Sequence, residues 1–379
     1  MTAYLDANAT EPLRPEARTA VLAALDLLGN PASVHAAGRA ARRVLEDARA
    51  MVAARFGAMA AGVIFTSGGT EANALAIAGL SPGRRVIIGA TEHDAVRAAA
   101  PGAEAVPVDA DGVADLDALA RMLAGPPALA CLMLANNETG TLQPVAAAAA
   151  LCRQHGALLH VDAVQAAGRI DTDLGALGAH SMALSSHKLG GPKGAGALLL
   201  APGQEVAPLI RGGGQERGRR GGTPALPAIA GFAAAVMTAR VDVQAMRDAA
   251  EAHAVRCGAT VLGGNGRLPN TSCLALPGVR ADTQVIALDL AGVAVSAGAA
   301  CSSGKVARSH VLDAMGLGTL AGEAIRVSLP WSATWDDVRA FQVAYAAMAA
   351  RLAKRAGTSH QKSCRAEMLA RREAALDPA

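Results

Sequence analysis

Short runs of apolar residues alternate with alanine-rich stretches through roughly the first half of the chain, and this alternation strongly constrains the fold. Because strands that are apolar throughout are buried on both faces, the pattern predicts a mainly parallel sheet covered by helices. Ligands of such sheets bind at the carboxyl ends of the strands. The expected strands span 63–65, 85–88, 129–134, 158–161, 182–184 and 195–200. The expected helices between them span 71–79, 94–99, 116–123, 145–155 and the stretch up to 178.

The second half of the chain has a different pattern. Residues 211–223 are too rich in glycine and arginine for the interior of an element, and they predict a long functional loop. A helix is expected from Leu226 to about Ala252. Beyond it, a smaller α+β domain is indicated by the segments 271–276, 285–289, 293–296 and 324–328.

Composition excludes several classes of protein. With 379 residues, 52% of them hydrophobic, the chain can bury a large core in one or two domains. A net charge of +3 is too small to argue for a nucleic-acid partner, and no apolar run is long enough to predict a membrane span. The six cysteines form no CxxC pair, and the charged, proline-containing N-terminus does not read as a signal peptide. We therefore expect reduced thiols and a cytoplasmic location.

Two segments indicate a pyridoxal phosphate (PLP) site. Lys188 lies between an apolar run and a glycine-rich turn, and Asp162 follows another apolar run upstream. A lysine that forms a Schiff base and an aspartate for the pyridinium nitrogen are the minimum that PLP requires. A surface lysine and an aspartate that only ends a strand would leave the same pattern, so these two segments alone leave both interpretations open.

Three further motifs follow expected strands. At Gly69 and Thr70 a glycine turn leads into a helix, and the backbone N–H groups there could bind a phosphate or simply begin an ordinary capped helix. His93 could lie against a cofactor ring or be a structural histidine. Asn137 could meet a substrate or build a turn.

Cys301 differs from the other cysteines in its surroundings. Glycines and serines flank it and Lys305 is near, which predicts an exposed loop and a thiol that ionises readily. Cys131, Cys152 and Cys273 lie in apolar runs and are expected to be inert core thiols. An incidental loop cysteine is the alternative interpretation of Cys301.

Taken in order and spacing, these motifs resemble the cysteine desulfurases of the NifS/IscS type, which are fold-type I PLP enzymes of the class-V aminotransferase family. The resemblance covers roughly residues 4–345, and the serine-rich loop around Cys301 is similar to the branch with a long mobile loop. In one departure, Pro330-Trp331-Ser332 stands where the family has Gly-Arg-Phe or Gly-Arg-Tyr. In another, the tail after about residue 352 matches no pattern of the family.

The resemblance implies an α/β architecture in two domains. Residues 14–250 would form a large PLP-binding domain with a mainly parallel seven-stranded sheet. Residues 1–13 and 251–352 would form a smaller α+β domain that carries the mobile cysteine loop. Residues 353–379 would be a charged C-terminal tail.

The resemblance also implies a role for each matching residue. The catalytic residues would be Lys188, Cys301 and His93. Asn137 and Arg326 would bind the substrate carboxylate, and Thr223 would reach the phosphate in the neighbouring subunit of a homodimer. The cofactor-binding residues would be Gly69, Thr70, His93, Asp162, Gln165, Ser185, His187, Lys188 and Thr223.

The implied reaction converts L-cysteine to L-alanine and leaves a persulfide on Cys301, whose sulfur passes to an iron–sulfur scaffold or to a thiolation pathway. No metal site is predicted, although Cys301 could ligate a cluster transiently during transfer. The alternatives are a selenocysteine lyase, another class-V PLP enzyme such as an aminotransferase, and a catalytically silent sulfur-relay or scaffold protein. An aminotransferase needs no such thiol, and the intact Lys188, Asp162, Gln165 and His93 argue against a silent partner.

Overall fold

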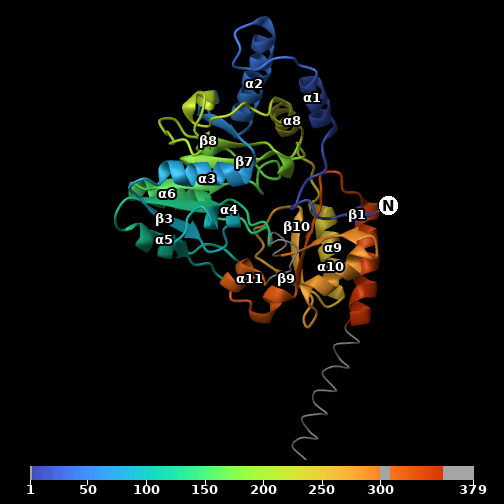
Figure 1. Ribbon diagram of the computed structural model, residues 1–379. Helices are drawn as coiled ribbons and strands as arrows, with labels where there is room; N and C mark the ends of the chain where they lie inside the picture. The colour runs from blue at the N-terminus through green and yellow to red at the C-terminus, as the bar shows by residue number, and fades with distance from the viewer. Residues whose placement is uncertain (1, 299–307, 353–379) are drawn as a thin grey trace, which may run out of the picture.

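A seven-stranded sheet forms the centre of the larger domain of the computed structural model, which describes residues 2–298 and 308–352 (Figure 1). The strand order is β2-β8-β7-β6-β5-β3-β4. Strand β8 alone runs opposite to the other six strands of this sheet, so the expected mainly parallel sheet is confirmed. The strands are β2 (Val63–Thr66), β3 (Arg85–Gly89), β4 (Glu104–Val106), β5 (Ala128–Met133), β6 (Leu158–Asp162), β7 (Ser181–Ser185) and β8 (Gly196–Leu200).

Both faces of the sheet are buried, as its uniformly apolar strands predict. Successive residues of a strand point to opposite faces, and Val63 and Phe65 accordingly pack in one hydrophobic cluster while Ile64 packs in the other. The helices of this domain are α1 (Pro15–Leu25), α2 (Ala36–Arg55), α3 (Gly69–Leu80), α4 (Asp94–Arg97), α5 (Leu116–Leu123), α6 (Val145–Gln154), α7 (Leu174–Leu177) and α8 (Leu226–Val236), with short 3₁₀ turns η1 (Ala60–Gly62), η2 (Ser186–Lys188) and η3 (Gln215–Gly218).

The smaller domain has its own core and its own sheets. An antiparallel sheet has the order β12-β13-β10-β9, and β1 pairs in parallel with β11, which attaches the N-terminal segment to this domain. The strands are β1 (Ala3–Tyr4), β9 (Thr260–Leu262), β10 (Thr271–Ala275), β11 (Val293–Ala294), β12 (Ser296–Ala297) and β13 (Ala324–Ser328). The helices are α9 (Gln244–Arg256), α10 (Ala281–Asp289), α11 (His310–Ala314), η4 (Gly318–Gly322) and a last helix that begins at residue 335 and continues to the end of the described chain.

The single helix expected from Leu226 to Ala252 is wrong, because the structure divides it into α8 and α9. The side chain of Asp242 accepts a hydrogen bond from the backbone N–H of Gln244, at the start of α9, and this local contact favours a new helix over continuation of the old one. Ala250 and Ala254 of α9 pack in the core of the small domain. The predicted domain limits of 14–250 and 251–352 remain a proposal, and this packing favours assigning α9 to the small domain.

Candidate active site

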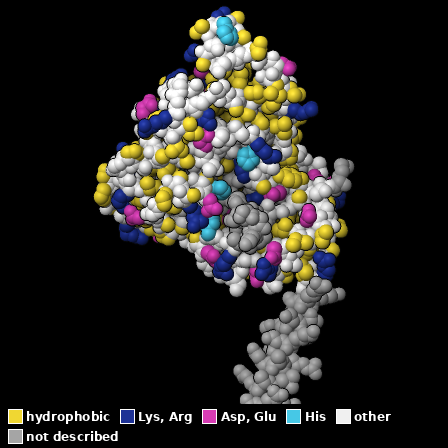
Figure 2. Space-filling view, in the orientation of Figure 1, with side chains coloured by type: hydrophobic (Ala, Val, Ile, Leu, Met, Phe, Trp, Pro, Cys, Tyr) yellow, Lys and Arg dark blue, Asp and Glu magenta, His cyan; other side chains and the backbone are white. Residues whose placement is uncertain are grey.

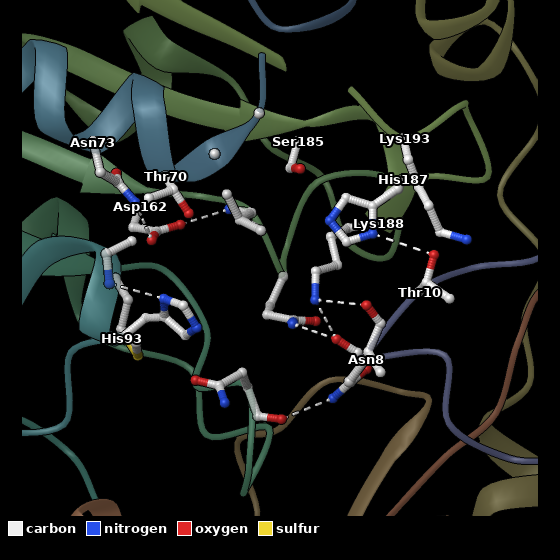
Figure 3. Close-up of a pocket in the computed structure, with 18 of the residues that line it drawn as sticks. Asn8, Thr10, Thr70, Asn73, His93, Asp162, Ser185, His187, Lys188 and Lys193 are labelled. Atoms are coloured by element: carbon white, nitrogen blue, oxygen red, sulfur yellow. Dashed lines mark hydrogen bonds between the residues drawn. The ribbon is translucent and has the colours of Figure 1, made fainter. Parts of the chain in front are cut away.

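A cavity of about 690 Å³ lies at the carboxyl ends of the central strands, between the two domains (Figure 3). Parallel strands bring their carboxyl ends to one edge of a sheet, so residues distant in sequence meet there. Of the residues predicted for the site, this cavity is lined by Gly69, Thr70, His93, Asn137, Asp162, Gln165, Ser185, His187, Lys188 and Arg326. Among the described residues, the structure therefore brings together every predicted site residue except Thr223.

Asp162 ends β6 and receives a donor on each carboxylate oxygen. Its Oδ1 accepts from the backbone N–H of Val164 at 2.9 Å, and its Oδ2 accepts from Asn73 Nδ2 at 2.7 Å. The other end of the Asn73 amide lies 2.9 Å from His160 Nε2, and His160 Nδ1 lies 2.8 Å from Ser181 Oγ. We call these four side chains, Asp162, Asn73, His160 and Ser181, the Asp162 network.

The protonation of the Asp162 network follows from its contacts. Complete burial lowers the pKa of His160 to about 3, so its imidazole is neutral at ordinary pH. Because Asn73 Nδ2 donates to Asp162, its Oδ1 must accept, so the proton of His160 is on Nε2 and Ser181 donates to Nδ1. The network thus holds Asp162 in one orientation with neutral groups alone.

A second carboxyl group, Glu92, is buried close to this network. Its Oε1 accepts from the backbone N–H of Met133 at 2.7 Å, and within the described residues its Oε2 has no hydrogen-bond partner. Burial, with a further contribution from Asp162, raises the pKa of Glu92 well above its ordinary value. Burial therefore disfavours a second negative charge beside Asp162.

The start of α3 forms another side of the cavity. A Cβ at Gly69 would lie 2.6 Å from the Val164 side chain, so only glycine lets this helix begin so close to the loop after Asp162. The backbone N–H groups of the first helical turn carry partial positive charge and can bind an anion. Thr70 and Ser185 add hydroxyl groups to the same side of the cavity.

His187 lies between this side of the cavity and the N-terminal segment. Its Nδ1 lies 3.2 Å from Thr10 Oγ1. Burial first, and then the neighbouring Lys188 and Lys193, lower the pKa of His187 to about 4. The side chain is therefore neutral and can exchange hydrogen bonds with an anion without competing for charge.

His93 has a structural contact as well as a place in the cavity wall. Its Nδ1 accepts from the backbone N–H of Ala95 at 3.0 Å and so caps α4. This contact places the ring proton on Nε2 when the imidazole is neutral. Both interpretations of this histidine are thus compatible with its position, since capping through one nitrogen leaves the ring on the cavity wall.

Lys188 and Gln165 converge on the backbone carbonyl of Asn8. Lys188 Nζ donates to this oxygen at 2.5 Å and to the carbonyl of Ala9 at 3.1 Å. Gln165 Nε2 donates to the same Asn8 oxygen at 3.0 Å. A single peptide of the N-terminal segment therefore orients both side chains.

Arg326, in β13 of the small domain, meets Asn137 of the large domain. Its Nη1 donates to the Asn137 backbone carbonyl at 3.1 Å, and its Nη2 donates to Asp6 Oδ1 at 2.8 Å. The guanidinium is buried, and its planar donors suit a carboxylate. Asn137 contributes its backbone carbonyl to this contact and is also among the residues that line the cavity.

Thr223 lies apart from the cavity of its own chain. It is exposed, at the end of the glycine-rich loop 211–223. The loop is anchored by Glu216, which accepts two hydrogen bonds from Arg49 at 2.7 and 2.8 Å. Arg49 and Glu216 are both buried, so the loop has a fixed attachment to α2.

The cysteines divide as predicted where the structure describes them. Cys131, Cys152 and Cys273 are buried and free, and burial raises the pKa of each thiol. These thiols are therefore inert at neutral pH. Cys301 lies outside the described residues. Among the residues that are described, no cluster of histidine, cysteine or acidic side chains could hold a metal ion, and no helix is long and apolar enough to cross a membrane.

Several residues of the site had not been singled out from the sequence: Asn8, Asp6, Thr10, Asn73 and Glu92. Asn73 follows the glycine turn at Gly69 and Thr70, and Asn8 lies in the N-terminal segment, but a single amide in a loop or at a helix start has no periodic signal. Their partners lie far away in the chain, as for Asn73 and Asp162, which are 89 positions apart.

Comparison with known proteins agrees with this geometry. The family model of class-V aminotransferases matches residues 3–341. A cysteine desulfurase of Cereibacter sphaeroides is 44% identical over 363 residues, which cover 90% of this chain and 94% of the relative. The cysteine desulfurase IscS of Dictyoglomus turgidum is 36% identical over 88% of this chain and 91% of the relative. The crystal structure of a NifS-like protein from Rickettsia africae superposes with a TM-score of 0.84 at 32% identity, covering 92% of this chain and 99% of the other.

Proposed function

This chain belongs to the class-V aminotransferase family, and we propose that it is a PLP-dependent cysteine desulfurase. It would convert L-cysteine to L-alanine and pass the sulfur to an acceptor protein. The observation that carries the proposal is the convergence of Lys188, Asp162 and the start of α3 on one cavity. An amine, a carboxylate and an anion site in one enclosed space are what this chemistry requires.

The cavity fits PLP by its donors and its size. Cysteine desulfurases of this family are PLP enzymes, and the cavity of about 690 Å³ lies within the usual range for cofactor sites. Lys188 would hold the cofactor through Nζ, and Asp162 would pair with the ring nitrogen. Gln165 would donate to the phenolic oxygen and His93 would lie against the ring. The phosphate would be bound by Gly69, Thr70, Ser185 and His187, with Thr223 from the second subunit.

PLP supplies an electron sink that stabilises negative charge on the carbon next to the substrate amine. The residues of the chain bind the substrate and move its protons. Arg326 would bind the carboxylate of cysteine, with Asn137 beside it, once Asp6 yields part of its ion pair with the guanidinium. Lys188 Nζ would take the proton from the α-carbon of cysteine and return a proton to the product.

Cys301 would accept the sulfur. Its thiolate would attack the sulfur of cysteine and form an S–S bond while the C–S bond breaks, and the electron pair of that bond would remain on carbon. Protonation of that carbon yields alanine, and the enzyme keeps a persulfide. Three of the four described cysteines are excluded, because Cys131, Cys152 and Cys273 are buried with raised pKa values, and the half-buried Cys257 is addressed by the test below. The acceptor would be an iron–sulfur scaffold or a thiolation protein, and the free thiols are consistent with a cytoplasmic location.

The active form would be a homodimer. Hydrophobic side chains gather on the surface around α1 (Figure 2), where Leu22, Leu25 and Leu28 are exposed. Contiguous exposed apolar surface is typical of a protein interface. The exposed Thr223, on a loop fixed by Arg49 and Glu216, could then reach an anion held by the second subunit.

The test is to expose the purified protein to L-cysteine and locate the sulfur. We expect alanine to be released and one sulfur atom to be added to the peptide that contains Cys301. Cys301→Ala should keep PLP and lose alanine release, whereas Cys257→Ala, a control at a half-buried free cysteine, should behave like the unchanged protein. Added sulfur on Cys257 or Cys364, or unchanged turnover by Cys301→Ala, would refute the proposal. Turnover of selenocysteine alone would instead favour a lyase.

A further inference from the structure

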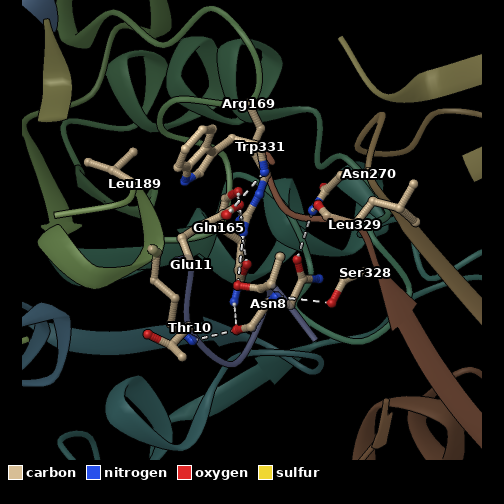
Figure 4. Close-up of polar contacts among 12 residues, drawn as sticks. Asn8, Thr10, Glu11, Gln165, Arg169, Leu189, Asn270, Ser328, Leu329 and Trp331 are labelled. Atoms are coloured by element: carbon tan, nitrogen blue, oxygen red, sulfur yellow. Dashed lines mark hydrogen bonds and ion pairs between the residues drawn. The ribbon is translucent and has the colours of Figure 1, made fainter. Parts of the chain in front are cut away.

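Arg169 is a buried cation directly behind the cavity wall, and the function proposed above assigns it no role (Figure 4). It lies four residues after Gln165 in the turn that follows β6. Its Nη1 donates to the side-chain Oε1 of Gln165 at 2.7 Å and to the backbone carbonyl of Gln165 at 2.8 Å. Its Nη2 donates to the Ala7 carbonyl at 3.2 Å and to Glu11 Oε1 at 3.3 Å.

These contacts decide which way the amide of Gln165 faces. An arginine can only donate hydrogen bonds, so the atom of Gln165 beside it must be the oxygen. The nitrogen must then be on the other side, where it donates to the Asn8 carbonyl and borders the cavity. The Asn8 carbonyl can only accept, so it favours the same orientation from the other side, and Arg169 is the second of two contacts that keep the amide oxygen away from the Asn8 side.

Arg169 is itself held by a buried ion pair. The Arg169 and Glu11 side chains are each only 7% exposed, and Glu11 Oε2 accepts from the backbone N–H of Trp331 at 3.2 Å. The indole of Trp331 donates to the Pro12 carbonyl at 2.8 Å, and the Arg14 guanidinium lies 4.9 Å from its ring centre. The segment Pro330-Trp331, which departs from the family pattern, therefore closes the outer side of this ion pair.

We propose that Arg169 is a positioning residue that, together with the Asn8 carbonyl, keeps Gln165 a hydrogen-bond donor toward the cavity and places the positive end of a buried ion pair behind it. The proposal rests on the proposed function, since the group that Gln165 meets there is the phenolic oxygen of PLP. A donor and a nearby cation both favour the deprotonated form of that oxygen. Arg169 would thus set the pH at which the bound cofactor changes its visible absorbance.

The test is a pH titration of the visible spectrum of the PLP-loaded dimer. Arg169→Met removes the donor and the charge, and we expect the midpoint of the titration to rise by at least about one pH unit. Arg169→Lys keeps the positive charge but lacks the paired N–H donors of a guanidinium. Its titration midpoint should therefore lie between those of the unchanged protein and Arg169→Met. We also expect the dissociation constant for PLP, measured by adding PLP to the apo protein, to rise roughly tenfold for Arg169→Met.

The charged and titratable groups that face the cavity stay the same in all variants, so a shift reports on Arg169. They are Asp6, Glu71, His93, Asp162, His187, Lys188, Lys193 and Arg326. Arg247→Met is the matched control, because Arg247 is also buried but lies in α9, away from the cavity. It should lower thermal stability and leave the midpoint unchanged.

An Arg169→Met protein that folds, binds PLP and has the midpoint of the unchanged protein would overturn the proposal. If Arg169→Met does not fold, Arg169→Lys decides: an unchanged midpoint together with unchanged PLP affinity would overturn it. Unaltered protein that binds no PLP would refute the proposed function as well, whereas normal binding without a shift would refute only the role of Arg169.

Discussion

Two polar networks border the cavity, and they are built on different principles. The Asp162 network consists of neutral groups around one carboxylate, and all its members belong to the large domain. The other, which we call the Asn8 network, comprises Asn8, Gln165, Lys188, Arg169 and Glu11, and it contains a buried ion pair.

The two networks also differ in what they join. Asn8 Nδ2 donates to Thr271 Oγ1 at 3.0 Å, and its backbone N–H donates to Ser328 Oγ at 3.0 Å, both in the small domain. The Asn8 carbonyl meanwhile accepts from two side chains of the large domain. One side of the cavity is therefore independent of how the domains pack, and the other is defined by that packing.

The largest loss of activity is expected when Asp162, the only carboxylate of the Asp162 network, is replaced. Asp162→Asn keeps the shape of the side chain but removes its negative charge, so it should lower alanine production from cysteine by roughly a hundred- to a thousandfold. Asp171→Asn, at an exposed aspartate, is the control and should be silent. An Asp162→Asn enzyme with normal turnover would mean that this network does not serve the cofactor.

The next largest effect, a loss of stability, is expected at Asn8, whose hydrogen bonds join the two domains. Asn8→Ala removes the bonds of its side chain to Thr271, Asn137 and Asn270 while the backbone carbonyl stays in place. Leaving buried partners unsatisfied should lower the free energy of unfolding by up to about 3 kcal/mol, measured in urea. The exposed Asn265→Ala is the control. No loss of stability would show that Asn8 does not couple the domains.

The pH dependence of stability should distinguish the Asp162 network, with its neutral histidine, from the Asn8 network. His160 takes up a proton near pH 6.5 when unfolded but only near pH 3 when folded, so lowering the pH favours the unfolded chain. Between pH 7 and pH 5 this histidine should cost the apo protein about 2 kcal/mol of stability.

His160→Gln should remove that part of the pH dependence. Unfolding of the apo protein in urea at both pH values measures the difference, and His155→Gln, at an exposed histidine, should leave it unchanged. An equal fall in stability for His160→Gln and for the unaltered chain would mean that His160 is not held neutral.

The smallest loss of stability is expected at Trp331, where the sequence departs from the family pattern. Trp331→Phe removes the indole donor to Pro12 but retains an aromatic ring beside Arg14, so stability should fall by about 1 kcal/mol. Trp335→Phe, at an exposed tryptophan, should not change it. A large loss of PLP in Trp331→Phe would mean that this residue does more than close the ion pair.

The sequence predicted the fold well where burial is uniform. Strands β2, β3, β5, β6, β7 and β8 were expected because both of their faces are covered, which makes them apolar throughout. Strand β4 was missed, since it is three residues long at the edge of the sheet and two of the three are exposed. The segment 285–289, expected only as part of the α+β domain, is the end of α10, since a short apolar run does not by itself distinguish a strand from a helix.

The site was predictable only in part for a related reason. Lys188, Asp162 and His93 were found because each follows an apolar run and carries a reactive group. Arg169 was missed, although it is buried, because nothing near it in sequence reveals Glu11, which lies 158 positions earlier. Local patterns identify the groups that could react, whereas the groups that orient them are defined by tertiary contacts.

The pairing of β1 with β11, and of Asn8 with Ser328, also has a consequence for biosynthesis. The segment that orients Lys188 and Gln165 is synthesised 320 residues before its partner Ser328. At about 5–20 residues per second, the nascent chain waits roughly 15 to 60 s before this side of the cavity can close. This side of the cavity is therefore completed only after β13 has been synthesised, and until then the segment around Asn8 lacks its partner.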